Sequence, residues 1–394
     1  MKKILIAISQ SFPYGAAYAA RTRALSKLFQ EAGYYVDILC DFPSEGAETE
    51  EYGNIFAVAP KQYSGIKALA YLPIIYKRKL DLLLSNNKYD LIVSRSMFDR
   101  FDKVLTVARK HRVPIILESC EWYDVRGFRH GKKDIRYYQF QHCFNKSYNK
   151  VDGVIAISRL LEKHYKELGI PVVRIPGIHD VEKLPYRLEP RNDKFLELIF
   201  GGNVFGGKEQ FSELLCAMSQ INANTKILRL HMYGSSEAEV VDSLNEEGRK
   251  AYEKLRNQLI FHGQIAQSEM ADACMEADFG LFFRPDRRSS HAGFPTKLGE
   301  YLSAGTPVIT NDTGDISLII ENGNNGFILK KPTTESIKRI LEKSILISPL
   351  ECCRIRTCAR NTAFEKLHYK EYVSEMIDFF DVINVKANGI KKTD

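Results

Sequence analysis

The feature that most constrains the fold is an alternation of short apolar runs and amphipathic stretches that occurs twice along the chain. In the first half, runs rich in Ile, Val and Leu cover residues 3–8, 35–40, 90–95, 114–118, 153–158 and 172–175. In the second half they cover residues 196–200, 228–233, 259–262, 280–283, 307–310 and 326–329. Near-continuous apolar strands of this kind are typical of parallel sheets buried on both faces. Each half therefore predicts a doubly wound, Rossmann-like α/β domain.

The polar stretch 182–193, which contains Pro185 and Pro190, separates the two halves. We expect a first domain over residues 1–181, a linker over 182–193 and a second domain over 194–361. We expect the aromatic-rich segment 362–394 to be a helix that returns to the first domain and packs across both. Two such domains would face each other across a cleft at the carboxyl ends of their strands, where α/β sheets bind ligands.

Composition excludes several classes of protein. No apolar run approaches the ~18–20 residues that span a bilayer, and the apolar start is too short for a signal peptide. The eight cysteines lack paired Cys-x-x-Cys spacing and predict free thiols in a reducing cytosol, not disulfides or a metal cluster. The net charge of +7 permits anionic partners such as phosphates or an acidic membrane without selecting among them. We expect no metal, no nucleic-acid partner and a cytoplasmic location.

The strongest local motif runs from His291 to Ile309 and contains Gly-Phe-Pro-Thr-Lys. Pro295 is suited to be the first residue of a helix. The amides of Thr296 and Lys297 would then be free at the helix start, where amides and dipole bind phosphate oxygens. Glu300, one turn further on, would reach a ribose diol.

A second motif, Phe200-Gly-Gly-Asn-Val-Phe-Gly-Gly-Lys208, follows a predicted strand and leads into a helix. Its glycines, Gly202 among them, let backbone amides approach an anion closely, and Lys208 adds a positive charge for a diphosphate. The spacing matches neither a P-loop nor a dinucleotide fingerprint. An NAD-dependent oxidoreductase is therefore disfavoured.

Two segments of the first half also follow predicted strands. Gly15 opens the first helix and allows close backbone approach to a ligand, while Arg21 and Arg23 are interpreted as part of that helix's solvated face. Glu121 precedes the only tryptophan, Trp122, and would contact a sugar or acceptor. Structural packing of the tryptophan is the alternative.

On these motifs, the chain resembles glycosyltransferase family 4, the retaining group with the GT-B fold, and especially its capsular and exopolysaccharide members. The resemblance covers nearly the whole chain. It includes residues 151–158 and 175–180, the turn 201–208, Tyr233-Gly234, Phe261-His262-Gly263, Ala277-Asp278 and, most specifically, Gly293–Ile309.

The resemblance implies a nucleotide-sugar donor, UDP-linked by default, and transfer to a glycan or undecaprenyl-type lipid-linked acceptor. It implies no protein nucleophile and no cofactor or metal. Three family residues are absent from this chain. Asn203 occupies the position of the diphosphate-binding arginine, Ala292 that of the first of two paired glutamates, and the cleft histidine would fall near Cys120. Arg284, just past a strand end, is then the candidate replacement for the missing positive charge. The implied donor contacts are Gly15, Gly202, Asn203, Lys208, His262, Gly263, Phe294, Pro295, Thr296, Lys297 and Glu300; the implied catalytic residues are Lys208, Arg284 and Glu121.

Two alternatives use the same architecture. A degenerate protein would bind a nucleotide sugar without turnover, which the three missing family residues favour. A sugar-nucleotide epimerase would not transfer sugar to an added acceptor.

Segment 64–84 also predicts a peripheral membrane contact. It combines an apolar stripe with the basic run Lys77-Arg78-Lys79, a pattern of interfacial helices attracted to anionic lipid. A second basic cluster comprises Arg126, Arg129, Lys132, Lys133 and Arg136. The alternative is a core helix kinked at Pro73 with solvated cations.

Overall fold

The computed structural model describes residues 2–15, 17–44, 50–62, 65–95, 98–191, 194–204, 209–225 and 227–390. Within it the chain divides into two compact units. The first consists of residues 1–179 and 369–394, and the second of residues 180–368. Helix α13 (Pro349–Leu367) runs through residue 361, where the sequence predicts the second domain to end, and the division between the units follows His368.

The first unit contains a parallel seven-stranded sheet with the order β5-β3-β1-β6-β7-β8-β9. Its strands are β1 (Lys2–Ile8), β3 (Tyr34–Cys40), β5 (Asn54–Ala57), β6 (Leu91–Arg95), β7 (Ile115–Ser119), β8 (Gly153–Ala156) and β9 (Val172–Arg174). A separate pair, β2 (Ser11–Phe12) and β4 (Phe42–Pro43), lies beyond β1 and β3 along the chain. The helices are α1 (Ala17–Glu31), α2 (Gly65–Asn86), α3 (Phe98–Lys110), α4 (Ile135–His142), α5 (Arg159–Glu167) and α14 (Val373–Ile390).

The order of this sheet reverses between β1 and β6, because the chain winds outward from β1 in one direction and from β6 in the other. Such a switch point opens a crevice at the carboxyl ends of the two central strands, where ligands bind in open α/β sheets. The residues that follow β1 and those at the end of β6 are therefore candidate ligand contacts.

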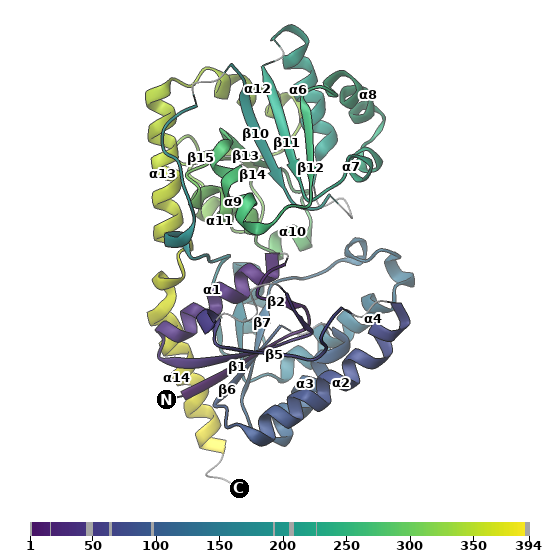
Figure 1. Cartoon of the computed structure of the whole chain (residues 1–394), viewed down its shortest axis with the longest axis vertical. Coiled ribbons are helices and arrows are strands. Elements are labelled where there is room, and N and C mark those ends of the chain that lie inside the picture. Colours follow the sequence, from purple (N-terminus) through teal and green to yellow (C-terminus); the bar gives the residue numbers. More distant parts are fainter. Residues whose placement is uncertain are drawn as a thin grey trace. The chain divides into compact units, whose positions relative to one another are not determined.

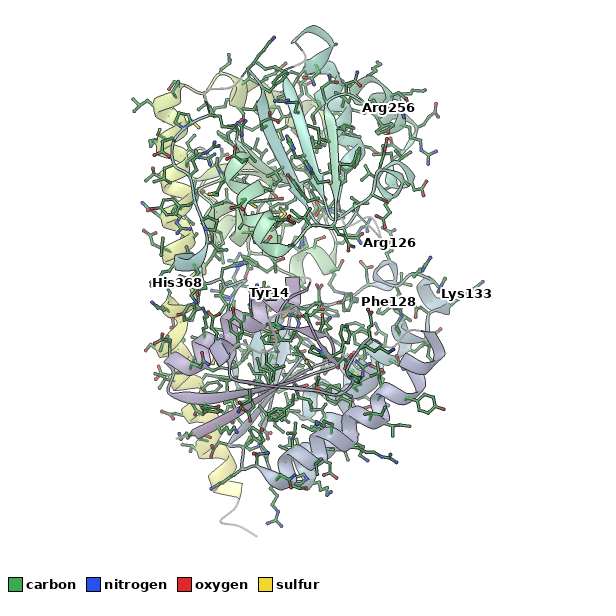
Figure 2. All side chains as sticks on the ribbon, in the orientation of Figure 1. Tyr14, Arg126, Phe128, Lys133, Arg256 and His368 are labelled. Carbon is green, nitrogen blue, oxygen red and sulfur yellow. The ribbon has the colours of Figure 1, made fainter. Side chains whose placement is uncertain are left out.

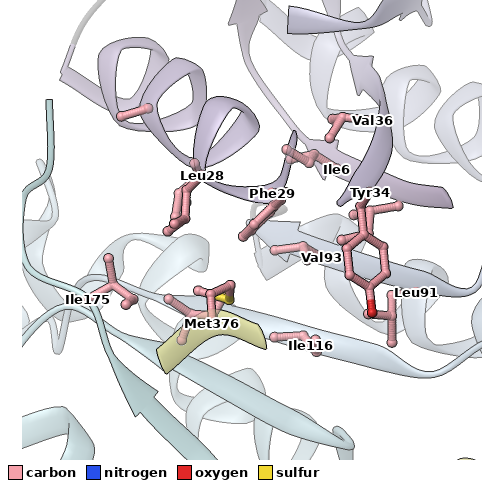
Figure 3. Packing of buried hydrophobic residues seen from close by; sticks show 14 of the residues in the cluster. Ile6, Leu28, Phe29, Tyr34, Val36, Leu91, Val93, Ile116, Ile175 and Met376 are labelled. Atoms are coloured by element: carbon pink, nitrogen blue, oxygen red, sulfur yellow. The ribbon is translucent and has the colours of Figure 1, made fainter. Parts of the chain in front are cut away.

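The core of the first unit joins both ends of the chain. Phe29 of α1 packs edge-on against Phe380 of α14 at a centroid distance of 5.3 Å. Figure 3 shows Phe29 and Met376 of α14 in one buried cluster with residues of β1, β3 and β6. A Cβ atom at Gly153 would lie 2.6 Å from Ile383 and 2.8 Å from Phe379. The strand β8 therefore has glycine where the C-terminal helix lies closest.

The second unit repeats the design with a parallel six-stranded sheet of order β12-β11-β10-β13-β14-β15 (Figure 1). Its strands are β10 (Leu196–Gly201), β11 (Leu228–Tyr233), β12 (Leu259–Gly263), β13 (Phe279–Phe282), β14 (Val308–Asn311) and β15 (Gly326–Leu329). The remaining helices are α6 (Phe211–Thr225), α7 (Glu237–Ser243), α8 (Glu246–Leu255), α9 (Gln267–Glu276), α10 (Arg288–Ala292), α11 (Thr296–Ser303), α12 (Thr334–Ile345) and α13. The switch point lies between β10 and β13.

The two parallel-sheet α/β units confirm the predicted fold class, and each apolar run of the sequence has its strand. The edge strand β5 and the short pair β2 and β4 were not predicted. β5 is half-buried and only four residues long, so it carries no strong apolar signal.

Candidate functional site

The switch point of the second sheet is flanked by Gly202, which follows β10, and by Arg284, which follows β13. Gly202 has a φ of +133°, a conformation that glycine adopts without strain. A Cβ atom there would lie 3.3 Å from Lys297 Nζ. The backbone turn and the lysine therefore lie against each other at this edge.

Lys297 lies in the first turn of α11 and forms a buried ion pair. Its Nζ is 2.8 Å from Oε1 of Glu209, and the two side chains are 12% and 4% exposed. Glu209 Oε2 accepts the backbone N–H of Phe283 at 3.0 Å, and Lys297 Nζ lies 3.9 Å from the centre of the Phe200 ring. Burial lowers the pKa of Lys297, with Arg284 adding to the effect and Glu209 opposing it.

The backbone of Arg284 is held by hydrogen bonds to the Asn311 side chain. Its N–H donates to Asn311 Oδ1 at 2.7 Å, and its carbonyl accepts Asn311 Nδ2 at 2.8 Å. Within the described residues its Nε is buried without a hydrogen-bond partner. A positioned guanidinium with unused donor capacity fits an anionic oxygen.

Helix α11 begins one residue later than the sequence predicts. Pro295 is the N-cap with extended backbone, and Thr296 is the first helical residue. Thr296 and Lys297 still lie in the first turn, with the Lys297 side chain beside Gly202, and Phe294 is buried in the preceding loop. Glu300 follows one turn later, half-buried, and its charge acts on Lys297. The structure thus brings Gly202, Arg284, Phe294–Lys297 and Glu300 together at one sheet edge.

Other predicted donor contacts lie further along this edge. Asn203 is exposed beside Gly202, and the Gly202 N–H donates to the carbonyl of Tyr233 at 2.9 Å. The Gly234 N–H donates in turn to the carbonyl of Gly263 at 2.7 Å. His262 stacks on Tyr233 with ring centres 4.2 Å apart. Lys208 lies outside the described residues.

In the first unit, the prediction that Arg21 is solvated is wrong. Arg21 is buried, its Nε lies 2.6 Å from Glu118 Oε1, and its other nitrogens donate to the carbonyls of Ile175 and Pro176. Burial alone would raise the pKa of Glu118, but Arg95 and Arg21 outweigh it, so the pKa lies below its ordinary value. Arg23 is partly exposed and donates to the carbonyl of Pro13.

Cys120 and Glu121 follow β7 directly. The Cys120 thiol donates to Glu118 Oε1 at 3.4 Å, and burial raises its pKa to about 12, so it is a neutral thiol. Glu121 is half-buried. Trp122 packs at tilted angles against Phe144 and His164, each with its ring centroid 4.6 Å away, which favours the packing role over a ligand contact.

Gly15 lies just before α1, and a Cβ atom added to it would lie 3.0 Å from the hydroxyl of Tyr18. It is exposed, and its neighbours Ser11 and Tyr18 are hydrogen-bonded at 3.0 Å. The first unit thus presents Gly15 and Glu121 at the carboxyl ends of β1 and β7.

Sequence reasoning missed Glu209, Asn311 and Glu118. Glu209 directly follows the Gly-rich turn, so a carboxylate at the start of the next helical segment was the available signal. Asn311 and Glu118 belong to largely apolar strands, where a buried amide or carboxylate side chain is the sign of a specific partner.

Helix α2 has both a core face and an exposed face. Leu72, Tyr76, Leu80, Leu83 and Leu84 are buried, as the core-helix alternative requires. On the other side, Tyr71, Ile74 and Leu82 are 59%, 48% and 55% exposed, and Arg78 lies on the same stripe. The side chains of Ile66 and Leu69 lie outside the described residues. In the second basic cluster, Arg126 and Lys133 are exposed (Figure 2).

Comparisons with known proteins agree with the fold. A family model described as Glycosyltransferase Family 4 matches residues 19–183, and one described as Glycosyl transferases group 1 matches residues 196–344. No curated protein matches the sequence significantly. Within the described helices, none is long and apolar enough to cross a membrane.

Solved structures share the fold at low sequence identity. The sucrose-phosphate synthase of Thermosynechococcus elongatus is 14% identical with a TM-score of 0.71, over 97% of this chain and 98% of that one. HepE of Anabaena, in complex with UDP and glucose, is 14% identical with a TM-score of 0.68, over 97% and 100%. A point mutant of S. aureus TarM, in complex with fondaparinux, alpha-GlcNAc-glycerol and UDP, is 12% identical with a TM-score of 0.68, over 96% and 100%.

Proposed function

This chain belongs to glycosyltransferase family 4, with the GT-B fold, and we propose that it transfers a hexosyl group from a nucleoside-diphosphate sugar to a hydroxyl acceptor. We propose uridine as the base, since HepE and TarM are similar in fold and were solved with UDP. The proposed acceptor is a glycan or an undecaprenyl-type lipid-linked sugar of surface polysaccharide biosynthesis. Gly15 in the first unit would add a donor contact.

One observation carries the proposal: Arg284, the start of α11 and the turn at Gly202 lie close together at the switch point of the second sheet, since a Cβ atom at Gly202 would lie 3.3 Å from Lys297 Nζ and the charge of Arg284 acts on Lys297. This is where doubly wound sheets bind ligands, and amides at a helix start with an oriented guanidinium favour phosphate oxygens. Glu300 would hold the ribose, and the edge from Gly202 to His262 and Gly263 would hold the base.

We propose transfer with retention of anomeric configuration. The bond from the anomeric carbon to the diphosphate oxygen breaks, and the acceptor oxygen bonds to that carbon on the same face. The acceptor's proton passes to the departing diphosphate. Arg284, the amides of Thr296 and Lys297, and Lys208 would stabilise the charge that develops on the leaving group. Glu121 would orient the acceptor.

The binding step is tested by calorimetry with UDP on the wild type and on Arg284→Met. Asn311 holds the Arg284 backbone, so the loop should survive the substitution. We expect at least tenfold weaker UDP binding. Arg288→Met, which removes an exposed cation of α10, should bind UDP normally. Equal UDP affinity in Arg284→Met and the wild type would contradict the proposed diphosphate site.

Turnover separates the enzyme from the two alternatives. Release of UDP from UDP-sugars, together with transfer to an added glycoside, distinguishes a transferase from a binding protein and from an epimerase. Because protein cations and amides are proposed to supply the charge, activity should persist in EDTA. Complete loss that Mg²⁺ or Mn²⁺ restores would oppose this account.

We further propose that the exposed stripe of α2 and the cluster around Arg126 and Lys133 attach the protein to the inner, anionic face of the cell membrane. Apolar side chains beside cations match interfacial helices. Binding to anionic but not neutral vesicles is expected, and it should weaken with salt and in Lys77/Arg78/Lys79→Ser. Ile74/Leu82→Ser tests the apolar part without changing charge. If neither vesicle binds at low salt, the acceptor is soluble.

A further inference from the structure

A group of polar side chains with buried polar atoms lies at the carboxyl edge of the first sheet, apart from the residues described above. Gln10 follows β1, Asp41 follows β3, and Arg100 lies in the first turn of α3. Arg100 Nη1 lies 3.0 Å from Asp41 Oδ2 and 3.5 Å from the carbonyl oxygen of Ser9. The Asp41 N–H donates to the Gln10 carbonyl at 3.0 Å. These three residues therefore form one cluster beside the switch point.

The hydrogen bonding of this cluster is incomplete. Within the described part of the chain, Gln10 Oε1, Asp41 Oδ1 and Arg100 Nε are buried without a hydrogen-bond partner. The Asp99 carboxylate lies 3.8 Å from Arg100 Nε, beyond hydrogen-bond distance. The Asp41 and Arg100 side chains are more than nine-tenths buried. Because buried polar atoms without partners cost free energy, such a set needs an explanation.

Asp37 of β3, the strand that leads to Asp41, shows that incomplete bonding is not general in this sheet. Its Oδ2 accepts the Tyr89 hydroxyl at 2.5 Å and lies 2.6 Å from Lys3 Nζ, and its Oδ1 accepts Asn54 Nδ2 at 3.0 Å. Asp37 is the central residue of β3, whereas Asp41 directly follows the carboxyl end of the strand. The unused atoms therefore occur at the end of the strand where α/β sheets bind ligands.

The chemistry of the unused atoms selects the ligand. Gln10 Oε1 and Asp41 Oδ1 accept hydrogen bonds, and Arg100 Nε donates one. A hydroxyl group both donates and accepts, so the hydroxyls of a sugar match this mixed set. A phosphate offers only acceptor oxygens and negative charge, and it would face the two acceptor oxygens unfavourably.

We propose that Gln10, Asp41 and Arg100 bind hydroxyl groups of a neutral sugar, the acceptor of the transfer. This assignment rests on the proposed function. It names the acceptor class and places its binding residues in the first unit.

Burial raises the pKa of Asp41 to about 6, with Asp99 adding to the effect and Arg100 opposing it. A hydroxyl that donates to Oδ1 binds the ionised carboxylate better than the protonated one. Sugar binding should therefore weaken as the pH falls through about 6. A merely structural role of Asp41 predicts no such dependence.

The experiment measures binding of a panel of neutral octyl glycosides by saturation-transfer NMR, with and without UDP, from pH 5 to pH 8. The variants are Asp41→Asn and Gln10→Leu, with Asp37→Asn as the matched control from β3. UDP binding is measured separately by calorimetry, and folding of each variant is checked by circular dichroism.

We expect at least one glycoside to bind the wild type and to bind Asp41→Asn at least tenfold more weakly, with the pH dependence lost. UDP affinity should be unchanged, and Asp37→Asn should bind the glycoside normally. The proposal is overturned if no glycoside binds a wild type that binds UDP, or if Asp41→Asn binds as the wild type does. It is also overturned if octyl phosphate, included as the anionic probe, binds in place of the glycosides. Failure of the wild type to bind UDP contradicts the proposed function instead, and glycoside binding still decides the present assignment.

Discussion

Replacing Glu209 by glutamine should destabilise the second unit strongly, because it leaves the buried Lys297 ammonium without its counter-ion. The carboxylate lies 2.8 Å from Lys297 Nζ and also accepts the Phe283 N–H. Glutamine keeps the shape and one acceptor oxygen but removes the charge. Breaking a buried pair by removing one partner typically costs about 3–5 kcal/mol.

An upper limit follows from the lysine itself, which can lose its proton instead of remaining charged. Its ordinary pKa is 10.5, so neutralising it at pH 7 costs about 5 kcal/mol, at ~1.4 kcal/mol per pKa unit. In the variant, the folded-state pKa of Lys297 lies below that of the unfolded chain. The unfolded state then binds more protons, and stability should recover by up to ~1.4 kcal/mol per pH unit as the pH rises toward 10.5.

Urea unfolding of Glu209→Gln and the wild type between pH 7 and pH 9.5 measures both effects. The control is Glu209→Gln/Lys297→Met, which removes both charges and should recover most of the lost stability. A loss below about 1 kcal/mol at pH 7, or a loss that does not change with pH, would refute the buried-charge reasoning.

Arg21→Met should lower the free energy of unfolding of the first unit in urea by about 3–5 kcal/mol, because Glu118 loses its buried partner. The control Arg23→Met should lower it by about 1 kcal/mol. Equal losses in the two variants would contradict the burial of Arg21. Gly280→Ala places a Cβ atom 2.3 Å from the Tyr301 ring, so it should lower the free energy of unfolding by about 3 kcal/mol or more. Gly323→Ala has no neighbour within 4 Å, but its φ of +80° should lower the free energy of unfolding by about 1–2 kcal/mol. Burial, with the charge of His231, lowers the pKa of His262, so its contribution to stability is complete above the ordinary pKa and is lost as the pH falls below it. Thermal melts from pH 8 to pH 5 should therefore show a smaller decrease in Tm for His262→Gln than for the wild type, and identical profiles would contradict this.

The fold could be predicted because its signal is local. Apolar runs such as residues 196–200 and 228–233 need no knowledge of their neighbours to indicate buried parallel strands. Pro295 and Gly202 were found for the same reason, since a helix start and a glycine turn are encoded in a few adjacent residues. Arg284 was named as a candidate from its place just beyond a strand end, and its role stays a prediction.

The buried charge pairs could not be predicted, because their partners are distant in sequence. Arg21 meets Glu118, 97 positions away, and Lys297 meets Glu209, 88 positions away. On an amphipathic helix, the sequence pattern predicts that an arginine lies on the solvated face. Only the tertiary arrangement shows that Arg21 turns toward the sheet edge and the carbonyls of Ile175 and Pro176.

Both units place a cation with an internal carboxylate beside the switch point of the sheet: Lys297 with Glu209, and Arg100 with Asp41. A lone cation buried at these positions would be strongly destabilising before any ligand binds, whereas a paired cation is tolerated. The two pairs differ in which hydrogen-bonding atoms beside them remain without a partner. Both oxygens of Glu209 are occupied, and beside this pair Arg284 has an unused donor, which fits an anion. In the first unit an acceptor oxygen of Asp41 remains unused, which fits a hydroxyl. The two proposed ligands therefore differ although the sheet geometry is the same: we propose a diphosphate for the second unit and a neutral sugar for the first.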